Sequence, residues 1–435
     1  MVKRRHIFNL ALSFLLLILL CTAFAFTWYH SYANKIVLPF YRKGNWLLVI
    51  VYAIFILLFF KIYKGFSINQ LKRFDIISSQ ILALICVNII TYFQISLIAR
   101  GLLKVVPILL LTLADIFISL FWTFFSCHLY RKLFPPRNLA IIYSSNAAST
   151  LVEKMSQRNE KYIITKSFNA EDENLYEEIL KFDGVVICDV NAKSRNDIVK
   201  FCFKNSLRVY MSPKISDIIM RGAEDLHLFD SPLLLCKNQG LTIEQKIIKR
   251  LVDIIVSLFG IIILSPLFLI ISMFIYSYDK GSVFYRQKRL TLNEKEFEVI
   301  KFRSMIVNAE KDGAILSTKN DNRITPIGKF IRKTRIDELP QLFNILKGEM
   351  SVVGPRPERP EFYNEYDENL PEFRYRLKIK AGLTGYAQVV GLYDTTPYDK
   401  LKLDLMYMEN YSLLKDMHII FLTAKMVLFP KIFSR

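Results

Sequence analysis

The sequence predicts a membrane protein of mixed α/β class: an N-terminal four-helix transmembrane bundle, a cytoplasmic α/β domain, and a compact, mainly α domain that starts with a re-entrant membrane helix. Long apolar runs fill the first third of the chain and recur once near its middle. Short apolar strands alternate with polar helical stretches in between, as in a parallel sheet. We place the domains at residues 1–136, 137–240 and 241–435, which suits a chain of this length.

The charge distribution favours a membrane over a nucleic acid as partner. The formal net charge is +19, from 58 basic and 39 acidic residues. Fifteen of the basic residues but only two of the acidic ones precede residue 138, where they flank apolar runs. Basic residues in that position orient spans in a bilayer, whereas nucleic-acid-binding proteins gather them in one patch. We therefore expect membrane lipid, and no nucleic acid, as a partner.

Four apolar segments come first, each about long enough to cross a bilayer. They are Ile7–Trp28, Trp46–Phe60, Ile76–Ala99 and Val105–Cys127. The first has the basic start of a signal peptide, but its length and the three spans after it favour a retained anchor. With the N-terminus inside, ten flanking Lys and Arg residues face the cytoplasm and five face outward. The N-terminus and everything after Arg137 are therefore expected in the cytoplasm.

Asp115 lies in the middle of the fourth span, where a charge is costly and often marks a functional site. We favour the alternative, a bundle-interior side chain that is neutral or hydrogen-bonded to Gln80, Asn88 or Gln94, because no other relay residue is nearby. A membrane sensor or transporter remains the alternative of another class. It would predict polar residues at several depths, whereas Asp115 is the only ionisable residue deep in the four spans.

The middle region contains four short apolar strands with the rhythm of a parallel α/β sheet. They are Leu139–Tyr143, Tyr162–Thr165, Val185–Val190 and Leu207–Met211. The turn after the first strand, residues 144–149, contains no glycine and therefore lacks the dinucleotide-binding motif G-x-G-x-x-G. We expect a degenerate Rossmann-like domain with a scaffolding or regulatory role.

A fifth apolar run covers residues 251–276, with Ser265 and Pro266 near its middle. Basic residues flank both ends, which favours both ends on the cytoplasmic side. Proline removes a backbone donor and clashes with the preceding turn. We expect a helix that enters one leaflet, breaks at Ser265 and Pro266, and returns; an ordinary kinked span is the alternative.

Adjacent carboxylates, Asp337 and Glu338, precede a helical stretch that ends at Gly348. Acids in a first turn often do no more than complement the helix dipole. Here Pro340 stiffens the turn, and basic residues recur in short motifs around the pair, which favours a phosphate-binding site. These basic residues are Lys301, Arg303, Arg323, Arg332 and Arg356.

A series of motifs makes residues 246–432 resemble the bacterial sugar transferase family, the polyprenyl-phosphate glycosyl-1-phosphate transferases that begin exopolysaccharide, capsule, O-antigen or glycoprotein glycan assembly. The motifs are Phe284–Arg289, Ile300–Met305, Asn320–Ile324, Arg335–Leu342, Val353–Pro357, Ala381–Gln388 and Tyr411–Asp416. The four spans and the Rossmann-like domain resemble the long form of the family. The resemblance implies transfer of a sugar 1-phosphate from a UDP-sugar to undecaprenyl phosphate with release of UMP, a Mg²⁺ requirement, and a covalent phospho-sugar intermediate.

Carried over motif by motif, the resemblance implies that Asp337 is the nucleophile and that Glu338 helps it to place Mg²⁺. By the same resemblance, Lys301, Arg332 and Arg356 would contact phosphate groups, and Asp416 would complete the polar site from the last helix. Arg303 and Arg323 are further candidates for phosphate binding. Leu392 departs from the pattern, because many relatives have Arg there, and Lys400 is a possible substitute. Glucose or galactose is the favoured sugar on resemblance alone, with an N-acetylated sugar as the alternative. Whether the chain forms a homo-oligomer is left open.

Overall fold

The computed structural model describes residues 2–36, 40, 42–69, 71–144, 148–236, 240–307, 321–391 and 395–428. The chain divides into two compact units, Met1–Lys214 and Ile215–Arg435. The domain boundaries expected at residues 136 and 240 stay predictions.

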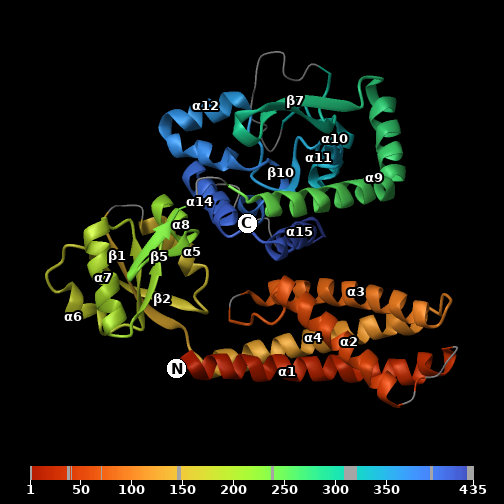
Figure 1. Ribbon diagram of the computed structural model, residues 1–435, viewed down its shortest axis with the longest axis horizontal. Helices are drawn as coiled ribbons and strands as arrows, with labels where there is room; N and C mark the ends of the chain where they lie inside the picture. The colour runs from red at the N-terminus through yellow and green to blue at the C-terminus, as the bar shows by residue number, and fades with distance from the viewer. Residues whose placement is uncertain are drawn as a thin grey trace. The chain divides into compact units, whose positions relative to one another are not determined.

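The first unit begins with four long apolar helices. They are α1 (Val2–Thr27), α2 (Arg42–Tyr63), α3 (Arg73–Ile98) and α4 (Val106–Leu133). Short π and 3₁₀ turns, η1 (Trp28–Tyr32) and η2 (Ala33–Lys35), continue α1. Helices α1 and α3 each pack against both α2 and α4, so the four form a closed group (Figure 1).

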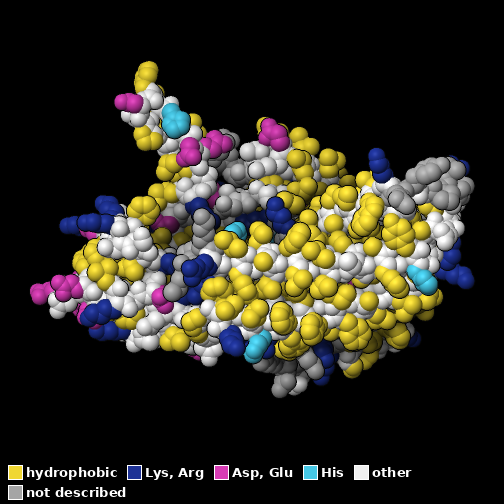
Figure 2. Space-filling view, turned by 90° about the horizontal axis from the view of Figure 1, so that it is seen from below, with side chains coloured by type: hydrophobic (Ala, Val, Ile, Leu, Met, Phe, Trp, Pro, Cys, Tyr) yellow, Lys and Arg dark blue, Asp and Glu magenta, His cyan; other side chains and the backbone are white. Residues whose placement is uncertain are grey.

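Apolar side chains cover the outward face of these helices (Figure 2). Phe14, Leu47, Phe117 and Phe121, for example, are exposed. Exposed apolar surface of this extent is costly in water and is typical of a lipid-facing or partner-facing surface. Together with α9 (Ile243–Asp279), they make five described helices that are long and apolar enough to cross a membrane.

The interior of the helical group is partly polar. Asp115 is completely buried, and its Oδ2 accepts hydrogen bonds from the Tyr52 hydroxyl and from Asn88 Nδ2, each at 3.0 Å. A second pair joins Gln80 to Thr123, whose hydroxyl donates to Gln80 Oε1 at 3.0 Å. The predicted contact of Asp115 with Asn88 is confirmed, and Tyr52 is an added partner that sequence reasoning missed.

The α/β part of the first unit is a four-stranded sheet in the order β2-β1-β3-β4, parallel throughout. Its elements, in chain order, are β1 (Arg137–Tyr143), α5 (Ala148–Ser156), β2 (Tyr162–Asn169), α6 (Leu175–Ile179), β3 (Gly184–Cys188), α7 (Ala192–Lys204) and β4 (Arg208–Met211). The central strands β1 and β3 are buried on both faces, as expected of a parallel sheet. The predicted parallel sheet is therefore confirmed, whereas residues 145–147 of its first turn lie outside the described residues.

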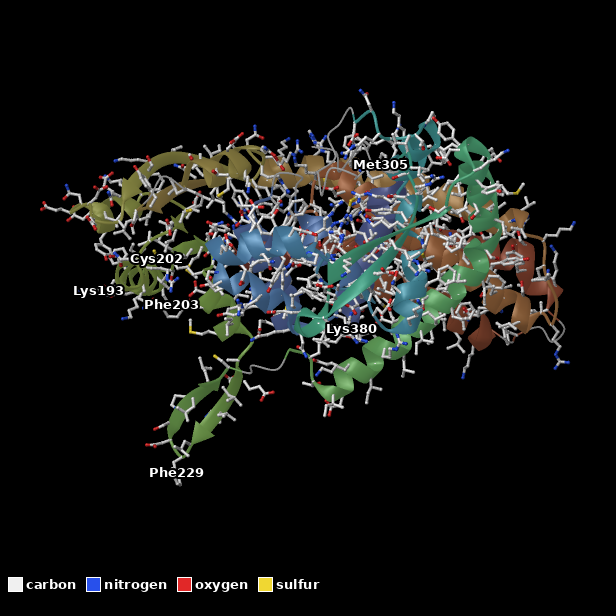
Figure 3. The ribbon with its side chains drawn as sticks, turned by 90° about the horizontal axis from the view of Figure 1, so that it is seen from above. Lys193, Cys202, Phe203, Phe229, Met305 and Lys380 are labelled. Atoms are coloured by element: carbon white, nitrogen blue, oxygen red, sulfur yellow. The ribbon has the colours of Figure 1, made fainter. Side chains whose placement is uncertain are left out.

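The second unit begins with α8 (Ile215–Arg221) and a hairpin of β5 (Glu224–Leu228) and β6 (Ser231–Leu235). Phe229 lies at the tip of this hairpin (Figure 3) and is 96% exposed. Helix α9 follows, started by a capping box in which the Thr242 and Gln245 side chains bind each other's backbone amides. Pro266 lies within α9, and Figure 1 shows the helix bent into a longer first part and a shorter second part.

The rest of the second unit surrounds one apolar core that includes Phe302, Ile345, Phe373, Leu401 and Ile419. Its strands are the antiparallel pair β7 (Phe284–Leu290) and β8 (Glu296–Phe302) and the parallel pair β9 (Ser351–Val353) and β10 (Gly382–Thr384). Its helices are α10 (Pro326–Lys333), α11 (Gln341–Lys347), α12 (Pro360–Asn369), α13 (Tyr386–Val390), α14 (Pro397–Glu409) and α15 (Leu413–Leu428). Short 3₁₀ turns are η3 (Leu292–Glu294), η4 (Ile336–Glu338) and η5 (Pro371–Lys378).

Candidate active site

The two adjacent carboxylates lie on η4, the short turn between α10 and α11. Helix α10 starts where the Thr325 hydroxyl accepts from the Gly328 amide, and it carries Pro326 in its first turn. After α10, Arg335 adopts a left-handed conformation with φ of 60°, which turns the chain into η4. Asp337 and Glu338 are therefore fixed between two helices rather than inside one.

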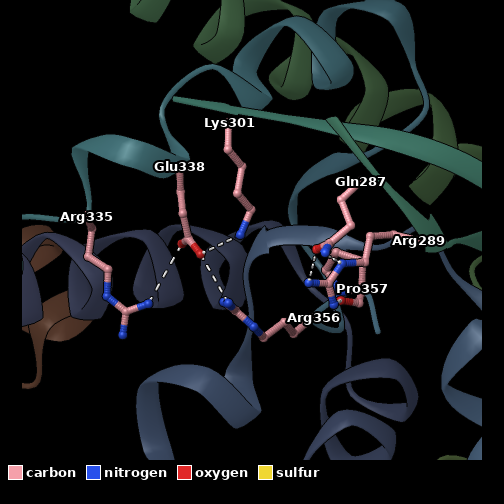
Figure 4. A network of polar contacts seen from close by, with 7 residues as sticks. All are labelled: Gln287, Arg289, Lys301, Arg335, Glu338, Arg356 and Pro357. Atoms are coloured by element: carbon pink, nitrogen blue, oxygen red, sulfur yellow. Dashed lines mark hydrogen bonds and ion pairs between the residues drawn. The ribbon is translucent and has the colours of Figure 1, made fainter. Parts of the chain in front are cut away.

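Glu338 is surrounded by cations (Figure 4). Its Oε1 lies 3.3 Å from Lys301 Nζ and 3.1 Å from Arg356 Nη2, and its Oε2 lies 3.8 Å from Arg335 Nη1. The side chain is 13% exposed. Although burial opposes its charge, the charges of Arg356 and Lys301 hold the pKa of Glu338 well below its usual range. Glu338 is therefore ionised at any physiological pH.

Asp337 is surrounded differently, because burial and the charge of Glu338 outweigh the effect of the nearby cations. Its Oδ1 is buried and has no hydrogen-bond partner among the described residues. Burial, together with the neighbouring charge of Glu338, raises the pKa of Asp337 to about 6. Two carboxylates whose environments push their pKa values apart are typical of a catalytic pair with divided roles.

Lys301 comes from the β7–β8 hairpin, which forms one wall of the site. In its antiparallel register Lys301 lies opposite Tyr285 and Arg289 opposite Phe297, so Lys301 and Arg289 share one face. Burial lowers the pKa of Lys301, although the charge of Glu338 opposes this shift. Lys301 and Arg289 also line a small pocket together with Glu338, Gln341 and Arg356.

Arg356 is presented by the chain that leaves β9. There the Gly354 amide donates to Thr384 O at 2.8 Å, and the Gly382 amide donates to Pro355 O at 2.9 Å. A Cβ atom on Gly354 would lie 2.3 Å from Lys380 O, so only glycine permits this approach of the two segments. The close backbone packing fixes the start of the arm that carries Arg356 to Glu338.

The other predicted phosphate ligands are arranged differently. Arg303 forms a double hydrogen bond with Asp279, and Arg323 forms one with Asp321. Arg332 lies on α10, where its charge lowers the pKa of Asp337 against the stronger effects of burial and Glu338. The structure thus gathers Lys301 and Arg356 at the carboxylate pair and gives Arg303 and Arg323 carboxylate partners elsewhere.

Asp416 belongs to a separate buried cluster. Its Oδ2 lies 2.7 Å from Lys249 Nζ, and its Oδ1 accepts from the Tyr407 hydroxyl at 2.5 Å. One turn after Lys249, Asp253 Oδ1 accepts from the Ser351 hydroxyl and the Val352 amide. This cluster joins α9 to β9, α14 and α15, so the contacts of Asp416 support the fold around the site; its predicted role at the carboxylate pair stays a prediction.

Leu392 and Lys400 are the remaining residues that the motif comparison singled out. Leu392 lies outside the described residues, and its suggested substitute Lys400 lies on α14, where its charge helps to lower the pKa of Glu358.

Sequence reasoning missed Arg289 and Arg335 as members of the site. Alternation along the β7 sequence could have indicated Arg289, because Tyr285, Gln287 and Arg289 fall on one face of a strand.

The carboxylate pair could hold a divalent cation only if a bound substrate supplied further oxygen ligands. Among the described residues, no group of three or more His, Cys, Asp or Glu could hold a metal ion. Mg²⁺ is commonly bound through one or two carboxylates plus substrate phosphates. The partnerless Oδ1 of Asp337 offers one oxygen, and Oε2 of Glu338, which faces only the long contact to Arg335, offers another.

Comparisons with known proteins bear directly on this second unit. A family model described as bacterial sugar transferase matches residues 244–430. A putative undecaprenyl-phosphate N-acetylgalactosaminyl 1-phosphate transferase of Bacillus subtilis is 48% identical over 130 residues, which are 30% of this chain and 73% of that protein. The chain belongs to the bacterial sugar transferase family.

Longer members of the sugar transferase family are also similar. The UDP-glucose:undecaprenyl-phosphate glucose-1-phosphate transferase of Klebsiella pneumoniae is 41% identical over 210 residues, 47% of this chain and 43% of that protein. The UDP-N-acetylgalactosamine-undecaprenyl-phosphate N-acetylgalactosaminephosphotransferase of Aeromonas hydrophila is 37% identical over 233 residues, 52% of this chain and 54% of that protein. The chain thus spans about half the length of these relatives. The residues that match the family model include α9 from its second residue onward, the carboxylate pair, and the small pocket lined by Lys301, Arg289 and Arg356.

Proposed function

We propose that this protein transfers a sugar 1-phosphate from a UDP-sugar to undecaprenyl phosphate and releases UMP, as the first membrane step of polysaccharide synthesis. The observation that carries the proposal is the partnerless, buried Oδ1 of Asp337 beside Glu338, whose Oε1 is paired with the cations Lys301 and Arg356. An unpaired carboxylate next to phosphate-binding cations suits nucleophilic attack on phosphorus. The names of the relatives support the same reaction class.

In the first step, an oxygen of the Asp337 carboxylate attacks the phosphorus that carries the sugar. A phosphorus–oxygen bond to Asp337 forms, the bond to the UMP phosphate breaks, and UMP leaves with the electron pair. The raised pKa of Asp337, about 6, makes its carboxylate more basic than an ordinary one while leaving it mostly ionised at pH 7. In the second step an oxygen of undecaprenyl phosphate attacks the same phosphorus and releases Asp337.

Glu338 and its cations hold the reacting groups. Lys301 and Arg356 both donate to Oε1 of Glu338. Each has further N–H groups, so each can donate to a phosphate oxygen while it keeps its hydrogen bond to Glu338. Mg²⁺, held by Asp337, Glu338 and the phosphates, would offset phosphate charge during the transfer. Arg303, Arg323 and Arg332 remain candidate phosphate contacts once a substrate is bound.

The location proposed for this chemistry is the cytoplasmic face of a bacterial membrane. The basic residues that flank the apolar runs support a cytoplasmic location for the N-terminus and for the residues after Arg137. The bend of α9, a helix that contains Pro266, supports a helix that enters one leaflet and returns (Figure 1). Such a helix would keep the carboxylate pair at headgroup level, where the phosphate of undecaprenyl phosphate lies.

The sugar is proposed to be glucose or galactose, with an N-acetylated sugar as the second candidate. Relatives named for glucose and for N-acetylgalactosamine match the chain to similar extents. Both candidates require the same reaction at the same carboxylate. A panel of UDP-sugars assayed for UMP release distinguishes them.

The decisive experiment combines purified protein, UDP-sugar, undecaprenyl phosphate and Mg²⁺. Wild-type protein should release UMP and, without acceptor, should carry a phospho-sugar adduct on Asp337 that mass spectrometry detects. Asp337→Asn should lack both, whereas the control Asp367→Asn, at an exposed pair with Arg374, should keep both. Normal UMP release by Asp337→Asn would refute the nucleophile assignment.

A further inference from the structure

Arg289 is held in place by neutral acceptors alone (Figure 4). Its Nε and Nη2 donate to Gln287 Oε1 at 3.1 and 2.6 Å, and its Nη1 donates to Pro357 O at 3.1 Å. Gln287 is itself fixed, because its Nε2 donates to the Tyr285 hydroxyl at 3.1 Å. A guanidinium has five N–H donors, so two of those on Arg289 have no acceptor among the described residues.

The charge of Arg289 has no ion-pair partner in the part of the chain that the structure describes. Burial and the charge of Arg356 lower the pKa of Arg289 to about 10, and the opposing charges of Glu358 and Glu338 compensate for this only in part. Burying a charge is costly unless it is paired. The two carboxylates whose charges act on Arg289 already have other cationic partners. Glu358 pairs with Arg376 at 3.4 Å, and Glu338 pairs with Lys301, Arg335 and Arg356.

The surroundings of Arg289 indicate which kind of ligand would neutralise its charge. Arg289 lies on the same face of the β7–β8 hairpin as Lys301 and lines the same pocket as Glu338 and Arg356. Three cations therefore border a pocket in which the one carboxylate among the described lining residues, Glu338, already has three cationic partners. The missing counter-charge is an anion with several oxygens, and a phosphate group suits the free edge of a guanidinium.

We propose that Arg289 is a substrate-binding residue that donates to a phosphate oxygen of one of the two substrates, with Gln287 as the positioning residue that orients it. The inference rests on the proposed transferase function. It assigns a role to the last residue of the motif Phe284–Arg289, which forms no ion pair with Glu338 among the described residues. The phosphate belongs either to the nucleotide diphosphate or to the lipid phosphate, because both carry the same chemistry.

The test is Arg289→Gln, with Arg286→Gln as its matched control. Arg286 lies on the same strand but on the opposite face, is 66% exposed, and pairs at 3.6 Å with Glu298. The KM for UDP-sugar and the KM for undecaprenyl phosphate are measured separately from UMP release. Arg289→Gln should raise one of them by roughly 10- to 100-fold, the loss expected for a charge-assisted hydrogen bond. Arg286→Gln should change neither.

The substrate whose KM rises identifies the phosphate that Arg289 holds. Unchanged KM values for both substrates in Arg289→Gln would overturn the proposal. Arg289→Lys should recover part of the loss, because it keeps the charge but cannot reproduce the fork to Gln287 and Pro357. A purely structural role would predict no such recovery and a fall in the thermal midpoint of Arg289→Gln.

Direct binding separates this inference from the proposed function. Calorimetric titration of wild-type protein and Arg289→Gln with UDP and with a short-chain polyprenyl phosphate reports on the phosphate contact without turnover. Weaker binding of one probe to Arg289→Gln than to wild-type protein would support the contact. If wild-type protein released no UMP, that result would refute the proposed function but not the contact. Equal binding of both probes to the two proteins would refute the contact.

Discussion

Lys301 Nζ lies 3.3 Å from Oε1 of Glu338, whereas the buried Oδ1 of the adjacent Asp337 has no partner among the described residues. Two neighbouring carboxylates thus have different electrostatic states, because the charges of Arg356 and Lys301 outweigh burial at Glu338, whereas burial and the charge of Glu338 outweigh the nearby cations at Asp337. The proposed division into a nucleophile and a paired, ionised partner follows from this asymmetry. Five predictions test the arrangement and its supports.

The rate of the first step should fall at acid pH. Because only the ionised carboxylate of Asp337 attacks, and its pKa is about 6, the rate of UMP release should drop about tenfold for each pH unit below 6. Glu338 adds no second decline between pH 5 and 8, because its pKa lies well below that range. Single-turnover UMP release without acceptor avoids titration of the lipid phosphate. A constant rate down to pH 5 would contradict the assignment.

Neutralising each carboxylate should have opposite effects on stability. The pKa of Asp337 is raised on folding, so its ionised form disfavours the folded state above pH 6, and Asp337→Asn should stabilise the protein by about 1 kcal/mol at pH 8. That gain should vanish as the pH falls through 6 toward 4. The pKa of Glu338 is lowered, so its contribution is present at neutral pH, and Glu338→Gln should cost about 1–3 kcal/mol. Thermal unfolding in detergent measures both; destabilisation by Asp337→Asn would contradict the first.

Replacing Glu294 by glycine should stabilise the tip of the β7–β8 hairpin. Glu294 has a φ of 61°, a left-handed conformation that costs most non-glycine residues about 1 kcal/mol. Glu294→Gly should therefore raise stability by about 0.5 kcal/mol after the entropy of the unfolded chain is counted. Asn293, with a φ of 56°, is the matched control, because asparagine tolerates this conformation and Asn293→Gly should bring no gain. Equal effects of the two substitutions on the thermal midpoint would exclude strain at Glu294.

The buried pair of Lys249 and Asp416 should be far more sensitive to loss of one partner than of both. Lys249→Met leaves the Asp416 carboxylate buried with only the Tyr407 hydroxyl, and should cost about 3–5 kcal/mol. The double substitution Lys249→Met with Asp416→Leu should recover much of this loss, because no uncompensated charge remains. Thermal unfolding of the single and double variants gives the comparison, and additive losses would argue against coupling of the pair.

Both ends of α9 should face the cytoplasm. In a background without the native cysteines, Lys246→Cys before the apolar run and Ser282→Cys after it should react with an impermeant thiol reagent only when the cytoplasmic side is opened. Cysteine introduced at Lys35, in the first outward loop, serves as the periplasmic control. Labelling of Lys246→Cys and Ser282→Cys from opposite sides would show that α9 crosses the membrane.

The local elements followed from periodicity and composition. Each expected apolar segment overlaps a helix, as with Ile76–Ala99 and α3, and each expected strand of the middle region overlaps a strand of the parallel sheet. The helical stretch expected after Asp337 and Glu338 is α11, which begins at Gln341, directly after its N-cap residue Pro340. Apolar spacing is a local property, so the sequence alone is sufficient to reveal it.

The site was only partly predictable. Asp337, Glu338, Lys301 and Arg356 were singled out from their motifs, and the structure brings all four together. Arg303, Arg323 and Asp416 were singled out on the same grounds but have partners elsewhere, in Asp279, Asp321 and Lys249. A motif shows which chemical groups are present but not which of them meet, because ion pairing depends on distances across the fold.

By itself, the sequence determined the succession of apolar helices and strands, the family and the carboxylate pair, because each is encoded by residues that are neighbours or share a local period. Only the tertiary structure decided that Glu338 is paired while Asp337 Oδ1 is left without a partner, and that Arg289 joins Lys301 on one face of a hairpin. The physical reason is that charge and desolvation act through space, so residues far apart in the chain set the state of each carboxylate.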